Sequence, residues 1–208
     1  MLFFWENLLF LLWLFMVVLR YGNSKVFIDF FYLFFMDIKK FIRTVPNWPK
    51  EGVMFRDITT LLKNPEAVKY VMDKFYEKYK DVEIDKVVGV ESRGFIFGSL
   101  LAERLNKPFI LARKPKKLPA EHTVVEYELE YGKDALAIHN DGIDENDSVL
   151  IVDDLLATAG TLNAVIQIVE KLKGNICECA CVIELPDLKG REKIKGYDVF
   201  SLVEFAGD

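Results

Sequence analysis

The sequence contains few cysteines, and their arrangement excludes two common kinds of site. Cys177, Cys179 and Cys181 occupy alternating positions, with neither a CxxC pair nor a histidine beside them. This spacing lacks the ligand pairs of a structural zinc site, and an odd number of cysteines does not make a disulfide framework. Alternate residues of a strand share one face. We therefore predict buried thiols on a core strand, in a reducing compartment.

The chain also lacks an excess of positive charge. It has 27 Lys and Arg residues against 32 Asp and Glu residues, which gives a net charge of −5. Proteins that bind nucleic acid along a broad surface need a basic excess to neutralise the phosphates. The composition therefore argues against a general nucleic-acid-binding surface, although it allows a small local basic patch.

No uninterrupted apolar run has the length of an ordinary membrane-spanning helix. The longest, residues 8–19, has twelve residues, whereas a span needs about 20. Residues 1–36 nevertheless hold nine of the 17 phenylalanines, without the basic start or cleavage site of a signal peptide. We predict that residues 1–35 are a hydrophobic extension, either an anchor or a gene-model extension. One domain would then occupy residues 36–208 in the cytoplasm, with membrane association left open by the extension.

The remainder alternates between strand and helix patterns, which predicts an α/β fold with a mostly parallel sheet flanked by helices. Ligands bind such sheets at the carboxyl ends of the strands. We expect three such ends after Glu91, Ala112 and Asp153. Residues 123–131 alternate as a half-exposed strand does, with residues 135–139 as a partner. The predicted core strands are residues 86–91, 108–112, 149–153, 176–185 and 199–205, and the main helices are residues 65–80, 95–105 and 161–173.

Two adjacent carboxylates, Asp153 and Asp154, follow the apolar residues 149–152, and a loop of small residues comes next. Such carboxylates can accept hydrogen bonds from a diol, hold a metal or transfer protons. Backbone N–H groups at a following helix start can bind a phosphate. A diol beside a phosphate describes a ribose 5-phosphate. A solvated acidic turn with a threonine N-cap explains the pair equally well, whereas a Walker B strand would need a GxxxxGK[ST] motif, which the chain lacks.

Positive charge follows the two other strand ends. Arg93 lies between a strand and a helix, where an anion could bind, although a surface salt bridge is an equal alternative. The stretch 113–117, RKPKK, is the densest basic cluster in the chain. Charge runs usually form a solvated face. Its place after a strand end in an acidic protein favours binding of a highly charged small molecule.

Six stretches together resemble one enzyme family. VLIVDDLLATAGT (149–161) is similar to the phosphoribosyl-diphosphate signature of the type I phosphoribosyltransferases. The full set resembles the adenine phosphoribosyltransferases within that family, over about residues 37–205. The other five stretches are GVMFRDITTLL (52–62), VVGVESRGFIFGSLLAERL (87–105), ARKPKKLP (112–119), YELEYGKDALAIH (127–139) and LKGREKI (188–194).

The resemblance implies a role for each candidate residue. Asp153 and Asp154 would hold the ribose hydroxyls. Glu130, on a mobile loop that closes over the site, would be the catalytic acid or base, with Arg93 also at the catalytic centre. The 5-phosphate would be bound by Ala157, Thr158, Ala159, Gly160 and Thr161, the diphosphate by Arg93 with its Glu91-Ser92 loop and by Arg113, Lys114 and Lys117, and adenine by Met54, Phe55, Arg56 and Tyr131.

The implied reaction joins adenine to 5-phosphoribosyl 1-diphosphate and releases AMP and diphosphate. The resemblance also implies a small hood beside the sheet, a homodimer, and Mg²⁺ carried by the substrate without a direct protein ligand. A different base, a non-catalytic regulator that senses phosphoribosyl diphosphate, and a membrane-tethered binding module remain alternatives. One departure is Ala159, where the family usually has glycine. If the backbone there needs a positive φ, alanine costs on the order of 1 kcal/mol.

Overall fold

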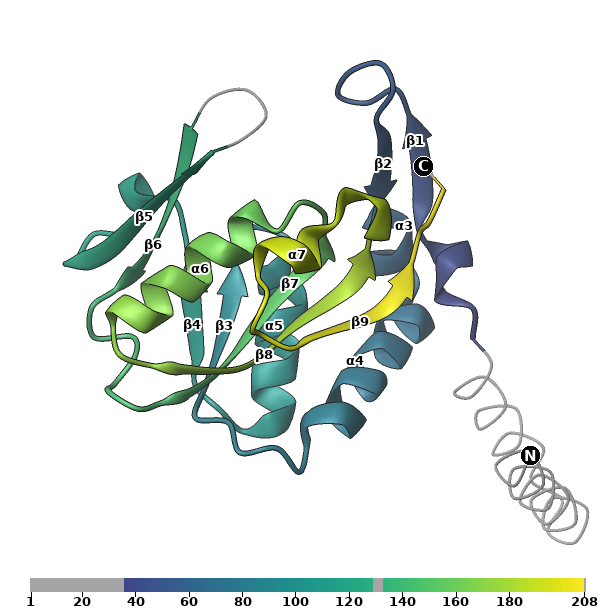
Figure 1. Cartoon of the computed structure of the whole chain (residues 1–208). Coiled ribbons are helices and arrows are strands. Elements are labelled where there is room, and N and C mark those ends of the chain that lie inside the picture. The colour runs from purple at the N-terminus through teal and green to yellow at the C-terminus, as the bar shows by residue number, and fades with distance from the viewer. Residues whose placement is uncertain (1–35, 129–132, 208) are drawn as a thin grey trace, which may run out of the picture. The chain divides into compact units, whose positions relative to one another are not determined.

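The computed structural model describes residues 36–128 and 133–207 (Figure 1). The predicted extension, residues 1–35, lies outside the described residues, so its nature stays a prediction. Within the described ranges, no helix combines the length and the apolar character needed to cross a membrane. The described chain divides into two compact units, which are treated separately below. One comprises residues 36–43 and 57–70, and the other comprises residues 44–56 and 71–207.

The larger unit is built on a five-stranded sheet with the strand order β4-β3-β7-β8-β9. All four neighbouring pairs are parallel, with Val88 of the second strand opposite both Ile110 and Ile151. This confirms the predicted α/β fold with a parallel sheet. The strands are β3 (Lys86–Val90), β4 (Phe109–Ala112), β7 (Ser148–Leu156), β8 (Asn175–Glu184) and β9 (Val199–Glu204).

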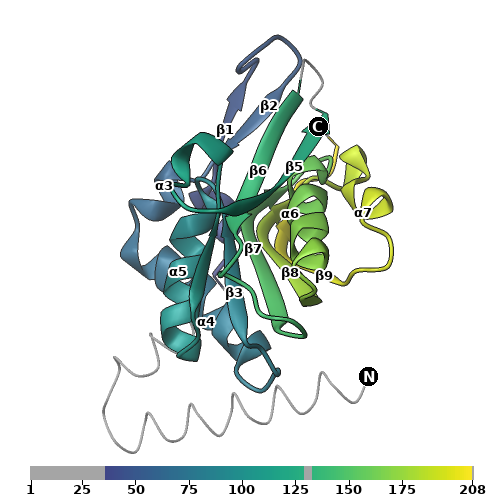
Figure 2. The same cartoon turned by 90° about the vertical axis from the view of Figure 1, so that its left-hand side faces the viewer.

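Two helices cover opposite faces of this sheet, α5 (Gly94–Leu105) and α6 (Gly160–Lys171) (Figure 2). Val88 and Val90 point to the face that α6 covers, where they share a core with Leu162 and Val165. Residues 87–90 of β3 and 149–152 of β7 are apolar because parallel strands between two helical layers are buried on both faces. The sequence pattern placed both helices within two residues of their observed ends.

An antiparallel hairpin of β5 (His122–Glu128) and β6 (Lys133–His139) packs beside α6. Val125 and Leu136 of the hairpin are buried in the same core as that helix. The hairpin is joined to the end of β4 by paired backbone bonds between Arg113 and Ala137, at 2.9 and 2.7 Å. The short helix η2 (Pro115–Lys117) lies between β4 and β5. The predicted strand 123–131 is therefore observed as far as Glu128, and residues 129–132 lie outside the described residues.

The predicted cysteine strand is β8. Cys179 and Cys181 are buried and Cys177 is half-buried, and all three are free thiols. Burial raises the pKa of the Cys179 thiol to about 12, so it stays protonated and unreactive at neutral pH. After β8 the chain forms η3 (Pro186–Leu188) and the one-turn helix α7 (Gly190–Lys193).

The smaller unit contains η1 (Ile38–Phe41), α3 (Thr59–Leu62) and the first part of α4 (Pro65–Tyr79), which continues into the larger unit. β1 (Arg43–Pro46) and β2 (Met54–Asp57) pair as a ribbon that lies in the larger unit except for its end residues Arg43 and Asp57. The sequence pattern predicted α4 but none of these shorter elements. They are too short for a periodic pattern to reveal.

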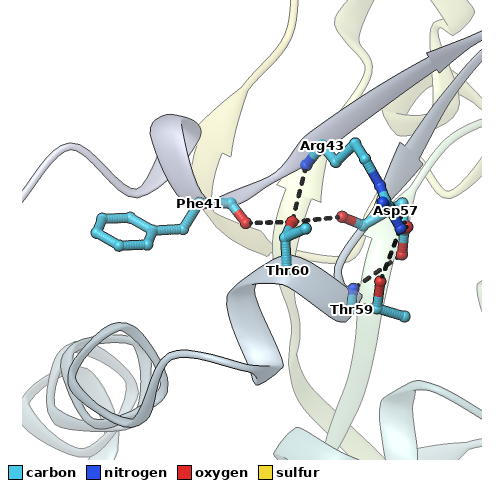
Figure 3. Close-up of polar contacts among 5 residues, drawn as sticks. All are labelled: Phe41, Arg43, Asp57, Thr59 and Thr60. Atoms are coloured by element: carbon cyan, nitrogen blue, oxygen red, sulfur yellow. Dashed lines mark hydrogen bonds and ion pairs between the residues drawn. The ribbon is translucent and has the colours of Figure 1, made fainter.

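A polar network ties the strand ends of the smaller unit to α3 (Figure 3). The Arg43 guanidinium donates to the Asp57 carboxylate, with Nε 3.0 Å from Oδ2. The other Asp57 oxygen accepts from the amide of Thr59, the first residue of α3, at 2.8 Å. Thr60 Oγ1 accepts from the Arg43 amide at 3.2 Å and donates to the Phe41 carbonyl at 2.7 Å. These side-chain bonds add to the burial of Ile58 and Leu61, which are 1% and 0% exposed in the same unit.

Candidate active site

The two adjacent carboxylates lie inside β7 and not at its end, which corrects the predicted strand boundary. The strand continues to Leu156 because its pairing with β8 extends through Leu156 and Glu184. Asp153 and Asp154 are buried, with 8 % and 3 % of their surface exposed. The Asp154 amide donates a hydrogen bond to Asp153 Oδ1, at 2.8 Å. Carboxylates of a buried strand need further donors, and a ligand can supply them.

Burial makes both carboxylates reluctant to ionise. It raises the pKa of Asp153 well above its ordinary value, and the neighbouring Asp154 charge raises it further. Burial likewise raises the pKa of Asp154, although Arg93 opposes the shift. Buried acids with displaced pKa values are typical of functional sites, because binding groups are held there at a cost in stability.

Arg93 supplies the cation that faces this pair. Its Nε lies 2.9 Å from Asp154 Oδ2, and its guanidinium lies 5.3 Å from the centre of the Phe55 ring. Arg93 directly precedes α5, and the peptide before Ser92 is cis. The helix start can approach β7 because Gly94 has no side chain. A methyl group there would lie 2.7 Å from the Val152 carbonyl oxygen.

The loop after β7, residues 157–161, is called the phosphate loop below. Its third residue, Ala159, adopts φ 59° and ψ 13°, the left-handed conformation, and is 5 % exposed. α6 begins at the next residue without a side-chain cap on its first turn. The amides of that turn therefore point out of a positive helix end, the arrangement that binds anions. The positive φ required by the loop falls on Ala159 and not on Gly160.

These segments surround one cavity of about 360 Å³. The structure thus brings together Arg93, both carboxylates and the phosphate loop, as the sequence predicted, although their individual roles stay predictions. The resemblance placed Glu91 and Ser92 of its wall in the loop beside Arg93, whereas Leu155 and Leu162 were not predicted as site residues. The cavity is lined by Glu91, Ser92, Arg93, Asp153, Asp154, Leu155, Ala157, Thr158, Ala159, Gly160, Thr161 and Leu162.

Glu91 forms hydrogen bonds and ion pairs with the predicted basic cluster, residues 113–117, at the edge of the cavity. Its carboxylate is 7 % exposed and accepts from Arg113 Nε at 3.3 Å, from the Lys114 amide at 3.1 Å, and from Lys117 Nζ. Burial raises the pKa of Glu91, but the bonds from Lys117, Lys114 and Arg113 outweigh burial and leave the pKa below its ordinary value. The Lys114 ammonium instead pairs with Asp134 of β6, at 3.0 Å.

The prediction did not pair Glu91 with Arg113, although Glu91 ends one predicted strand and Arg113 follows another. Val90 and Ala112 are paired in the sheet, so the residues that follow them, Glu91 and Arg113, emerge side by side. An acid after one strand and a base after its parallel neighbour are expected to meet. The predicted diphosphate-binding cations therefore have acidic partners in this structure, which an incoming anion would have to replace.

Among the described residues, Met54, Phe55 and Arg56, which were predicted to bind adenine, contact different parts of the structure. Phe55 packs against Trp48, with ring centres 4.4 Å apart, and against Arg93 of the first cavity. Met54 instead lines a second cavity of about 340 Å³ with residues 50–53, Leu185, Asp187, Leu188 and Phe205. Arg56 is buried, donates to Thr44 and stacks 4.2 Å from the Phe205 ring centre. The alternation of β2 explains the separation, since neighbouring side chains of a strand point to opposite faces. Glu130 and Tyr131 lie outside the described residues.

Comparison with known proteins identifies the family. The model of the phosphoribosyl transferase domain matches residues 57–208. The chain belongs to the phosphoribosyltransferase family. The adenine phosphoribosyltransferase of Desulfosudis oleivorans is 53% identical over 173 residues, which cover 83% of this chain and 100% of that protein. The resemblance stated from the six sequence stretches is thereby confirmed.

Solved structures agree with this assignment. The crystal structure of adenine phosphoribosyltransferase from Thermoanaerobacter pseudethanolicus has a TM-score of 0.79 and 46% identity, and covers 81% of this chain and 98% of its own. The Trypanosoma brucei enzyme, solved with AMP, pyrophosphate and ribose-5-phosphate, has a TM-score of 0.73 and 27% identity, with 80% and 78% of the two chains covered. These relatives are thus similar to this chain in both sequence and fold.

Proposed function

We propose that this chain is an adenine phosphoribosyltransferase of purine salvage, which converts adenine and 5-phosphoribosyl 1-diphosphate into AMP and diphosphate. The observation that carries the proposal is the 360 Å³ cavity, which places buried carboxylates beside a side-chain-poor helix start. The carboxylates suit a diol, and the backbone amides at the helix start suit a phosphate. The names and bound molecules of the relatives support the same substrates.

The ribose phosphate would occupy the end of the cavity formed by β7 and α6. Asp153 and Asp154 would accept hydrogen bonds from the ribose hydroxyls, which supplies the donors that the two buried carboxylates need. The amides of the phosphate loop and the hydroxyls of Thr158 and Thr161 would bind the 5-phosphate. Together these contacts would fix the sugar so that its C1 carbon points toward the bound diphosphate.

The diphosphate would lie toward Arg93 and the cluster held by Glu91. Cleavage of the bond between C1 and oxygen builds positive charge on the sugar and negative charge on the leaving group. Arg93, Arg113 and Lys117 would stabilise that negative charge more strongly as it develops, which lowers the barrier. These cations are gathered at the edge of the cavity beside acidic partners, which the diphosphate would replace when it binds.

The residues of the cavity fit a magnesium ion that arrives with the substrate. Mg²⁺ commonly binds substrate phosphates and keeps several waters, and the negative charge of Asp153 and Asp154 would favour the ion nearby without a direct bond to the protein. In residues 36–128 and 133–207, no group of three His, Cys, Asp or Glu side chains is placed to hold a metal. When bound, the ion would neutralise charge on the diphosphate.

The base would be activated by residues outside the described ranges. Glu130 is proposed to take or relay the proton of adenine, and Tyr131 to contact the base, both on a loop that closes over the sugar and excludes water. Phe55 is placed beside Arg93, where its ring could face a bound base. Met54 and Arg56 would contribute less directly, because they face away from that cavity.

A direct assay tests the proposed reaction. The purified full-length chain is incubated with radiolabelled adenine, 5-phosphoribosyl 1-diphosphate and Mg²⁺, and the expected product is labelled AMP. Parallel reactions with guanine, xanthine and orotate test the choice of base, and we expect no product with them. Absence of AMP under these conditions would contradict the proposal.

The role of Glu130 is tested by comparing two neighbouring acids. Glu130→Ala is expected to lower kcat by about 100-fold or more, the range of a lost general acid or base. Glu128→Ala removes an exposed acid at the end of β5 and serves as the matched control, with kcat close to wild type. Equal kcat values for the two variants would contradict the assignment.

Two broader expectations belong to the same proposal. Reduced cysteines favour the cytoplasm as the location. A homodimer is supported by exposed apolar side chains on α5 and β4, where Leu100 is 40% and Leu111 is 37% exposed. A second copy covering these side chains would remove them from water.

A further inference from the structure

The motif LKGREKI (188–194) resembles its counterpart in the family, but the proposed chemistry uses none of its side chains. Its glycine lies directly against the phosphate loop. Gly190 is buried at the start of α7, and a methyl group there would clash with the Ala157 carbonyl oxygen and lie 2.9 Å from Leu156 Cδ1. The backbone of α7 therefore touches the first residue of the phosphate loop.

The next residue fixes this helix to the sheet. Arg191 donates from Nε to Glu184 Oε1 at 2.7 Å and from Nη2 to Glu184 Oε2 at 2.6 Å, a two-pronged ion pair. Its Nη1 also donates to the Val199 carbonyl at 2.8 Å. Glu184 is 4% exposed and accepts a further bond from Ser201 Oγ at 2.6 Å. Arg191 thus joins α7 to the end of β8 and to β9.

The two contacts form a continuous support behind the loop. β8 ends at Glu184, and the next amide, Leu185, donates to the Leu156 carbonyl at 2.9 Å, at the end of β7. The phosphate loop leaves β7 one residue later. Its backbone is therefore held on one side by the end of β8 and on another by Gly190, and the Glu184–Arg191 pair joins these two supports.

We infer that Gly190 and Arg191 are positioning residues, which set the phosphate loop for the 5-phosphate through the Ala157 carbonyl, an inference that rests on the proposed function. Neither side chain needs to touch substrate. A side chain at position 190 would push the Ala157 peptide away, and the amides that follow it would move too. Anion binding by backbone amides depends on their fixed direction, so a small displacement weakens it.

Binding of ribose 5-phosphate, measured by titration calorimetry on the full-length chain, tests the inference without requiring catalysis. We expect Gly190→Ala to weaken this binding about ten-fold. Arg191→Lys keeps the positive charge but loses the two-pronged geometry, and we expect about three-fold weaker binding. Lys193→Ala removes an exposed charge from the same helix turn and is the matched control, with unchanged affinity.

The KM values of the two substrates provide a second readout. A general loss of stability would not raise the KM of one substrate more than that of the other. In both variants the KM for phosphoribosyl diphosphate should rise more than the KM for adenine. Wild-type affinity and KM values in Gly190→Ala and Arg191→Lys would overturn the inference, and so would an equal loss in Lys193→Ala. If Gly190→Ala fails to fold, Arg191→Lys decides. A wild-type chain that binds ribose 5-phosphate but makes no AMP would contradict the proposed reaction, while the relative affinities still decide this inference.

Discussion

Asp153 illustrates how a binding group can destabilise the protein that carries it. Its pKa lies well above the ordinary value of 3.8, chiefly through burial and then through the Asp154 charge. For an acid with a raised pKa in the folded state, stability is greatest below the ordinary pKa and falls as the pH rises through the folded value. At neutral pH the burial of Asp153 therefore lowers the free energy of unfolding.

Replacement of this carboxylate should separate stability from binding. Asp153→Asn keeps the oxygen that accepts from the Asp154 amide but removes the charge. We expect the free energy of unfolding without ligand to increase by about 1 kcal/mol at pH 7, while ribose 5-phosphate binds more weakly. Urea unfolding at pH 5 and pH 8 measures the first effect, which should be larger at pH 8. Asp141→Asn, at an exposed loop position, should change neither quantity. A less stable Asp153→Asn protein would contradict this account.

Ala159 adopts the conformation in which glycine costs least. The left-handed region is unfavourable by roughly 1–2 kcal/mol for a residue with a Cβ atom, and Ala159 lies in it at φ 59°. We expect Ala159→Gly to raise the free energy of unfolding by about 0.5–1 kcal/mol, the relief being partly offset by the flexibility of glycine when unfolded. Urea unfolding measures the change.

A second alanine provides the control of opposite sign. Ala164 lies within α6 and is fully buried. Ala164→Gly should lower the free energy of unfolding by about 1 kcal/mol or more, as glycine does inside helices. If both substitutions destabilise the chain, the positive φ at Ala159 is not a source of strain.

At the scale of elements, the network at the ends of β1 and β2 makes the smaller unit sensitive to acid. Hydrogen bonds from Arg43 and from the Thr59 amide lower the pKa of Asp57 from 3.8 to about 2. A carboxylate with a depressed pKa stabilises the fold above its ordinary pKa and loses that contribution as the pH falls through the folded value. The relevant window therefore runs from about pH 4 down to pH 2.

Removal of the Arg43 charge should therefore have a pH-dependent effect. Arg43→Met is expected to lower the free energy of unfolding by roughly 1 kcal/mol at pH 7, and by less as the pH approaches 2. Urea unfolding at pH 7, 5 and 3 follows the difference from wild type. Lys40→Met is the control, because Lys40 and Asp37 form an exposed pair at 3.8 Å in the same unit and should matter little. A constant difference at all three pH values would show that packing, and not charge, explains the loss.

At the scale of the whole molecule, the proposed homodimer can be tested by mass. Light scattering should give twice the 24.1 kDa of one chain. Leu111→Glu would place a charge in the contact and should yield a monomer, because a charge buried without a partner is strongly unfavourable. Val82→Glu changes a side chain of similar exposure after α4 and should leave the dimer intact. A wild-type monomer, or a Leu111→Glu dimer, would contradict the proposal.

The elements that could be predicted from the sequence are those with long local patterns. Periodicity predicted the strands β3, β7 and β8 and the helices α5 and α6. A face that is buried requires apolar residues at regular positions in the sequence. The phosphate loop could be predicted for the same reason, because small residues between a strand and a helix are contiguous. Even the cost of Ala159 was foreseeable, given the family resemblance.

Tertiary structure alone decided how distant residues combine. The sequence did not show that Glu91 collects Arg113 and Lys117, that β2 separates Phe55 from Met54, or that Gly190 supports the phosphate loop. These contacts join residues from different strands, helices and loops, and their partners are set by sheet order and register. The sequence by itself determined the main strands and helices and the chemical groups that the candidate binding segments carry. The fold determined which residues hold those segments in place, because that depends on distances between segments that no local pattern records.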